Sequence, residues 1–247
     1  MGAIPNRSLP MPAFPRRAAF VALLVLPSLT ACLPYTVGTT AQTVPANETT
    51  HSTSYYFVPN AFKSPDDSVG APMAGADYEW RHGLDVRSDV AVRLLPGGVT
   101  GSYKRRIGAD TSHRIGARAF TIGGGIVNWG EHALIEGTLM ASGREDGSMT
   151  PYGGVRAMQT IPITAGAVSD RPTIGVFGGL QIGNQWFSAR PELGVFYDHS
   201  ALGVRQSDVI FVPAITLMRG RRREDSYSDA TSRRPQALPR LPGLPRL

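Results

Sequence analysis

The chain has 247 residues, a formal charge of +6 and a pI near 9.8, values that raise the question of a nucleic-acid partner. The charge lies at the two ends: residues 1–31 carry +3 and residues 219–247 carry +5, which leaves residues 32–218 at −2. Such a region offers no basic face to phosphates, so no nucleic-acid partner is expected. The single cysteine, Cys32, excludes an intramolecular disulfide.

The N-terminal region has the features of an export signal in their usual order. Three arginines precede the apolar run 18–29, which is too short to span a bilayer as a helix, and small residues follow it. The four residues Leu-Thr-Ala-Cys at 29–32 resemble the lipobox of bacterial lipoproteins. That resemblance implies a signal peptide over 1–31, cleavage before Cys32, and diacylglycerol and fatty-acyl (palmitate-type) chains on Cys32 that anchor the chain in lipid.

The residue after the cysteine indicates the membrane to which the protein is sorted. Leu33 stands where enterobacterial lipoproteins retained in the inner membrane have Asp, so the resemblance implies sorting to the outer membrane of the cell envelope. The alternative is an ordinary signal peptide in which Cys32 is only a small apolar residue. Residues 32–52 are polar and rich in Thr, and they are predicted to form a tether between the lipid and the folded domain.

A β domain is predicted over 53–218, because apolar and polar residues alternate there with period two. In the segment LDVRSDVAVRL, residues 84–94, Leu, Val, Val, Val and Leu share one parity with Ser88 as the exception, and Asp and Arg occupy the other. Ten strands are predicted, near 53–60, 74–82, 84–94, 98–107, 113–127, 132–142, 151–160, 172–183, 185–198 and 207–218.

Most of these segments have roughly 9–14 residues, whereas a tilted strand needs about 9–11 to cross a bilayer. Strand edges in lipid would leave backbone groups unpaired, so such a sheet has to close. The pattern resembles small outer-membrane β-barrel proteins. It predicts an all-β fold: an antiparallel up-and-down barrel of about 8–10 strands whose exterior contacts membrane lipid.

The last predicted strand differs from that of typical outer-membrane barrels. The last predicted strand is apolar on both parities, contains Pro213 and does not end on an aromatic residue. A tethered soluble lipocalin-like domain that binds a ligand therefore stays open as an alternative. Residues 219–247 are rich in Arg and Pro and lack periodicity, which predicts a disordered basic tail.

Charged residues on the parity opposite the apolar one are candidates for a polar lumen. They are Asp85, Arg87, Asp89, Arg93, Glu136, Arg156, Arg190 and Glu192. In a narrow barrel these charges would pair, because an unpaired buried charge is costly. The prediction is a packed, salt-bridged interior, and the alternative is a conducting channel.

No catalytic or metal site is predicted. None of the five histidines, His51, His82, His113, His132 and His199, has metal-ligand spacing, and no cofactor is indicated. Only Ser112 with His113, and His199 with Ser200, are adjacent Ser–His pairs, and neighbours along a strand point to opposite faces. The sequence therefore favours a lipid-anchored outer-membrane protein with a structural or binding role and no identified protein partner. A small barrel enzyme acting on lipid A is a further alternative.

Overall fold

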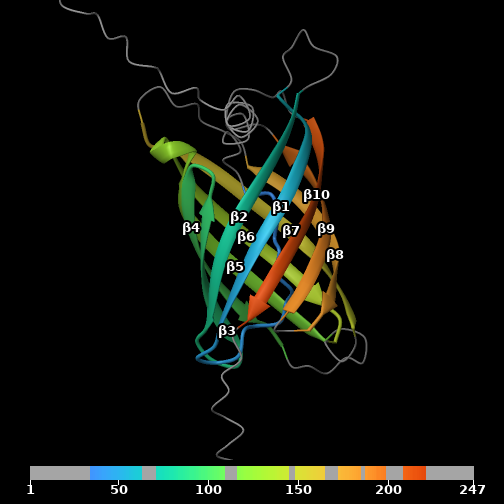
Figure 1. Cartoon of the computed structure of the whole chain (residues 1–247). Helices are drawn as coiled ribbons and strands as arrows, with labels where there is room; N and C mark the ends of the chain where they lie inside the picture. Colours follow the sequence, from blue (N-terminus) through green and yellow to red (C-terminus); the bar gives the residue numbers. More distant parts are fainter. Residues whose placement is uncertain are drawn as a thin grey trace, which may run out of the picture.

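A computed structural model describes residues 34–62, 71–108, 116–144, 148–164, 172–184, 187–198 and 208–220. Ten strands form one closed antiparallel barrel, in which consecutive strands pair and β1 pairs with β10 (Figure 1). The strands are β1 (Thr49–Phe62), β2 (Ala71–Gly83), β3 (Ser88–Leu95), β4 (Gly98–Arg106), β5 (Ala117–Val127), β6 (His132–Ser142), β7 (Met149–Pro162), β8 (Thr173–Gly183), β9 (Phe187–Asp198) and β10 (Asp208–Gly220). The predicted up-and-down antiparallel barrel is confirmed. The signal region, Cys32 and the tail beyond residue 220 lie outside the described residues.

Little regular structure accompanies the strands. One turn of 3-10 helix, η2 (Asn128–Gly130), joins β5 to β6. No helix in the described ranges is long and apolar enough to cross a membrane.

The apolar parity of the strands faces outward. On β8, Ile174 and Val176 are more than half exposed, whereas Thr173 and Phe177 on either side of them are buried. The same alternation recurs along the other strands because successive side chains of a strand point to opposite faces. The exterior of the barrel is therefore apolar, and the polar parity is turned inward.

The two ends of the barrel differ in what they carry. We call the end where β1 begins and β10 finishes the terminal end; it lies at the bottom of Figure 1. The opposite end, where β1 leads toward β2, is the loop end. An even number of up-and-down strands brings the start of the first strand and the finish of the last to the same end.

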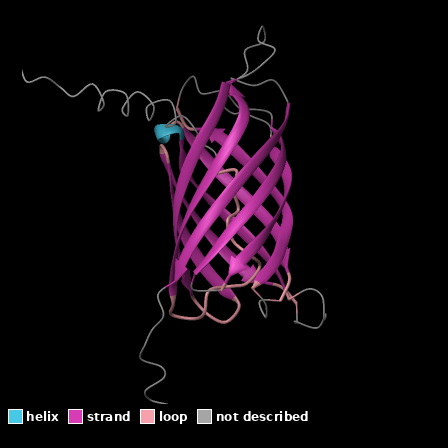
Figure 2. Cartoon of the chain, turned by 45° about the vertical axis from the view of Figure 1, so that its right-hand side comes forward, coloured by secondary structure: helices cyan, strands magenta, loops and turns pink. Residues whose placement is uncertain are grey.

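Residues 34–45, which we call the plug, run through the inside of the barrel (Figure 2). Tyr35 packs at the loop end, and Ala46, the residue after the plug, forms a bridge to Gly83 at the terminal end. All residues from 34 to 41 are buried. The structure therefore corrects the predicted tether over 32–52: residues 34–45 lie in the lumen and residues 49–52 belong to β1.

A second correction concerns the segment 84–94, which was predicted as one strand. The chain turns at 84–87, because the Asp85 carboxylate accepts hydrogen bonds from the Arg87 N–H and the Ser88 hydroxyl, each at 2.6 Å. These two bonds, that from Ser88 first, lower the pKa of Asp85. Asp85 and Arg87 are exposed in this turn and do not reach the lumen.

Glycine makes room for an aromatic ring inside the barrel. Phe196 of β9 pairs across the ladder with Gly175 of β8 and is fully buried. A Cβ on Gly175 would lie 2.2 Å from the Phe196 ring and 2.6 Å from the Val195 carbonyl oxygen. The ring can therefore lie over β8 only because that position carries no side chain.

This packing predicts the effect of one methyl group. Gly175→Ala should lower the free energy of unfolding by about 1–3 kcal/mol through overpacking. Gly178→Ala on the same strand is the control, since its Cβ would meet only the Tyr152 carbonyl oxygen at 4.0 Å. Urea unfolding of both variants in detergent measures the difference, and equal stabilities would contradict this account of Gly175.

Candidate functional site: a charged lumen filled by the plug

The buried charge of the lumen is divided equally between the two signs. Among the described residues, five basic and five acidic side chains are buried there: Arg81, Arg93, Lys104, Arg156 and Arg190, and Asp77, Glu79, Asp89, Glu136 and Glu192. Their formal charges cancel, and their side chains are almost wholly removed from solvent. Charges in such a place need ionic or hydrogen-bond partners, because their desolvation is otherwise very unfavourable.

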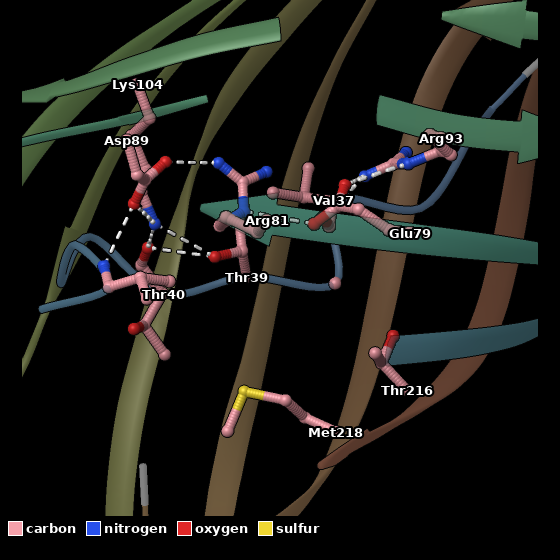
Figure 3. A network of polar contacts seen from close by, with 12 residues as sticks. Val37, Thr39, Thr40, Glu79, Arg81, Asp89, Arg93, Lys104, Thr216 and Met218 are labelled. Carbon is pink, nitrogen blue, oxygen red and sulfur yellow. Dashed lines mark hydrogen bonds and ion pairs between the residues drawn. The ribbon is translucent and has the colours of Figure 1, made fainter. Parts of the chain in front are cut away.

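A continuous ion-pair network joins β2, β3 and β4 (Figure 3). Glu79 lies between two guanidinium groups, with Oε1 3.0 Å from Arg81 Nε and Oε2 2.8 Å from Arg93 Nη2. Asp89 lies between two cations as well, with Oδ1 2.5 Å from Arg81 Nη1 and Oδ2 3.3 Å from Lys104 Nζ. Each carboxylate therefore neutralises parts of two cations, and Arg81 links the two carboxylates.

Across the lumen the charges are held differently. Arg156 of β7 forms an ion pair with Glu136 of β6. Arg190 of β9 donates from Nε to the Gln181 side-chain oxygen at 2.9 Å. The Tyr152 hydroxyl donates to Glu192 at 3.0 Å.

Lumen cations bind the main-chain carbonyl groups of the plug. The accepting residues are Thr36, Val37, Gly38, Thr40 and Gln42. Arg93 and Arg156 both donate to the Thr36 carbonyl, at 2.9 and 2.6 Å. Arg190 donates to Gly38 at 2.9 Å and Lys104 to Gln42 at 2.5 Å. Charged donors make stronger hydrogen bonds than neutral ones, so these contacts hold the plug along its length.

Lumen carboxylates bind the main-chain N–H groups of the plug. Glu192 accepts from Val37 and Gly38 at 2.9 and 3.1 Å. Asp89 accepts from Val44 at 3.1 Å. The barrel therefore recognises the plug chiefly through its backbone, and the plug adds no charge of its own.

Gly38 is the one plug position where both the backbone conformation and the close neighbours require glycine. Its φ of +64° is left-handed, and a Cβ there would lie 2.9 Å from both Ser54 Oγ and Thr216 Oγ1. The two hydroxyls are themselves hydrogen-bonded at 2.8 Å. Close approach of the plug to β1 and β10 therefore depends on glycine at this residue.

An apolar cluster surrounds the plug at the loop end of the lumen. The Tyr35 ring meets the Phe196 ring edge-on at 5.6 Å between centroids. The buried cluster around them consists of Tyr56, Val58, Met73, Leu95, Val127, Leu134, Met158, Ile210 and Val212. Close packing of these side chains holds the Tyr35 end of the plug in place.

A pocket lies between the plug and the barrel wall, and most of its lining residues are polar. It includes Thr39, Gln42 and Thr50 together with Glu79 and Arg81. Pockets for small apolar ligands are lined mainly by hydrophobic and aromatic side chains. A lipocalin-like ligand site of that type is therefore not what this lumen offers.

The sequence prediction and the structure can be compared residue by residue. Six of the eight candidates face the lumen: Asp89, Arg93, Glu136, Arg156, Arg190 and Glu192. Sequence reasoning missed Asp77, Glu79, Arg81 and Lys104. The first three alternate with aromatic residues along β2, a signal that was available. Lys104 is the first of three consecutive basic residues. The alternation of polar and apolar residues is interrupted there, so the sequence does not indicate which face of the strand Lys104 takes.

The histidines and serines considered for catalysis do not form a site in the described ranges. His51 lies near the Tyr78 hydroxyl at 3.4 Å, and His82 contacts Thr49 at 2.9 Å. His132 is buried at the loop end, 3.3 Å from the Asn128 side-chain nitrogen. The pairs at 112–113 and 199–200 lie outside the described residues. In the part of the chain that the structure describes, no three His, Cys, Asp or Glu side chains are grouped to hold a metal ion.

Comparisons with known proteins give a few distant likenesses. No family model and no curated protein matches the chain. The outer membrane protein OprG from Pseudomonas aeruginosa is 11% identical, with 74% of this chain and 97% of that chain covered and a TM-score of 0.29. Ail, the attachment invasion locus protein of Yersinia pestis, is 14% identical over 71% and 97% of the two chains, with a TM-score of 0.26. The structure of Ail in complex with the heparin analogue sucrose octasulfate is 15% identical over the same shares of the two chains, with a TM-score of 0.25. The properties of this barrel therefore have to be derived from its own residues.

The network predicts a large effect for Asp89→Asn. The substitution leaves Arg81 and Lys104 without their shared carboxylate, and breaking a buried pair in this way costs about 3–5 kcal/mol. Adding Lys104→Met should recover part of that loss, since it removes one of the stranded charges. Urea unfolding in detergent measures both.

Arg87→Gln, in the exposed β2–β3 turn, is the control and should change stability by less than about 0.5 kcal/mol. A loss no larger for Asp89→Asn than for this control would contradict the assigned network.

Proposed function

We propose that this protein is an integral outer-membrane β-barrel, closed to solute flow by its own plug and anchored by acyl chains on Cys32. Its role is structural or binding, with no catalytic step. The observation that carries the proposal is the distribution of polarity, with an apolar exterior around a lumen of buried charged side chains. Soluble barrels need a polar exterior, whereas lipid requires an apolar one.

The apolar exterior is continuous across neighbouring strands. Val176, Val195 and Phe211 form one row across β8, β9 and β10, and the first and last of them are 53% and 56% exposed. Contiguous apolar patches beyond a few hundred Å² are rare on water-soluble proteins. Hydrocarbon removes such a surface from water, and closure of the sheet leaves no unpaired edge in it.

The terminal end adds features suited to a lipid–water boundary. Arg105, Arg118 and Arg219 are exposed on the outward parity, each within two residues of a strand terminus at that end. Arginines there can extend toward anionic headgroups. Tyr78 and Trp80 pack edge-on at 4.3 Å between ring centroids on the same exterior, as aromatic residues at bilayer interfaces do.

The lipid anchor is supported by the lipobox-like residues 29–32 and by the position of the plug. Pro34, two residues after Cys32, is already buried in the lumen. Each acyl CH₂ buried in the bilayer contributes about 0.8 kcal/mol, so several chains bind firmly. The barrel would thus hold the segment that follows Cys32, and the acyl chains on Cys32 would attach that segment to the membrane.

Extraction of a Cys32→Ser protein, given an ordinary signal cleavage site, tests the proposal. We expect the mature chain to stay in the outer-membrane fraction through carbonate and urea washes, because the barrel exterior holds it there. Radioactive palmitate should label the unaltered protein and not the variant. A folded chain released into the soluble fraction would support the tethered soluble domain instead, and turnover of labelled lipid A by purified protein would support the barrel enzyme.

A charge on the exterior should be costly in proportion to its depth. Leu193 is half exposed near the middle of β9, and Leu193→Arg should make folding into phospholipid bilayers less favourable by about 2–4 kcal/mol. Phe187→Arg, at the first residue of β9, is the matched control and should cost about 0–1 kcal/mol. Urea titration in vesicles measures both, and equal costs at the two depths would count against a membrane-spanning exterior.

A further inference from the structure

The plug changes the side on which the N-terminal end leaves the barrel. Without it, both ends of a ten-stranded up-and-down barrel would emerge at the terminal end. The plug instead enters at the loop end, where Tyr35 meets Phe196, and leaves at the terminal end, where a Cβ on Gly83 would touch the Pro45 carbonyl. The ten residue steps from Tyr35 to Pro45 can span about 35 Å, which exceeds the hydrocarbon core of a bilayer, about 30 Å.

The lengths of the connections indicate which end faces outward. At the loop end, three of the five connections are long: 63–70, 163–172 and 199–207. At the terminal end, three of the four are short, 84–87, 143–148 and 184–186, and 107–116 is the exception. Transmembrane barrels have short periplasmic turns and longer external loops. The loop end therefore corresponds to the cell surface.

We propose that the plug carries the N-terminus through the barrel to the cell surface, so that the acyl chains on Cys32 insert in the outer leaflet while the basic tail starts on the periplasmic side. The lipid part of this inference rests on the acylation proposed above. Cys32 precedes Pro34 by two residues, at most about 7 Å of chain. The acyl chains cannot reach back to the periplasmic leaflet, because the plug fills the lumen between.

Threading also sets the order of assembly. The plug is enclosed by ion pairs at its middle and by the apolar cluster at the loop end, so a closed barrel has no passage for an acylated chain end. The plug must therefore be in place before β1 pairs with β10. Residues 46–48 alone separate it from β1, so the strand that closes the barrel is continuous with the segment that it encloses.

Epitope tags in the full chain test the inference. One tag is inserted between residues 33 and 34, a second after Leu247, and a third within the 163–172 connection as a marker of the surface. Heat-modifiable migration on gels verifies that each tagged chain is folded. We expect antibodies on intact cells to bind the first and third tags as strongly as on permeabilised cells, and to bind the second only after permeabilisation.

The outcomes separate this inference from the proposed function. If the tag at 33/34 is reached only after permeabilisation while the 163–172 tag is reached on intact cells, threading to the surface is overturned, although an integral acylated barrel would stand. If the 163–172 tag is hidden on intact cells, the assigned orientation is overturned. Failure of palmitate labelling would remove the lipid anchor and leave the tag result to decide the threading.

Discussion

Ten charged side chains share a lumen that lipid cannot solvate, and the rest of the structure depends on how they are neutralised. A sheet whose outer face meets hydrocarbon must turn its polar parity inward and must close. Closure then concentrates opposite charges within a narrow space. Pairing among strands satisfies part of them, as in the links from Arg81 to Glu79 and Asp89. The remaining donors and acceptors require a partner that the strands cannot supply, because their own backbone groups are occupied in the ladders.

The plug is that partner. An irregular segment exposes both N–H and C=O groups, and it can therefore serve arginines and carboxylates at the same time. Glu192 binds two successive N–H groups, whereas Arg93 and Arg156 converge on a single carbonyl. A charged plug would upset the balance of five basic and five acidic groups. Uncharged Thr, Val, Gly and Ala residues preserve it, and the absent side chain of Gly38 lets the backbone approach β1 and β10.

The same arrangement connects stability to membrane topology. Because the plug is bound along its whole length, it holds Pro34 and Tyr35 at the loop end of the barrel, away from the end where β10 finishes. A barrel filled in this way is suited to holding a segment of its own chain through the lumen and unsuited to passing solutes. Two parts of the lumen contribute to this, since the apolar cluster packs around Tyr35 at the loop end and the charged side chains bind the plug backbone at its middle.

The sequence by itself determined the strands and the face that each side chain takes, because period-two alternation is a local property of the chain. It identified Asp89, Arg93, Glu136, Arg156, Arg190 and Glu192 by parity, and it failed at Asp85 and Arg87, where a carboxylate hydrogen-bonded to its own backbone turns the chain. Only the tertiary structure decided which charges pair and what fills the space between them. A Thr-rich segment without charge or periodicity looks the same in a solvated tether as in a lumen. Its burial is set by the charges of six strands that surround it, and those strands meet only when the barrel closes.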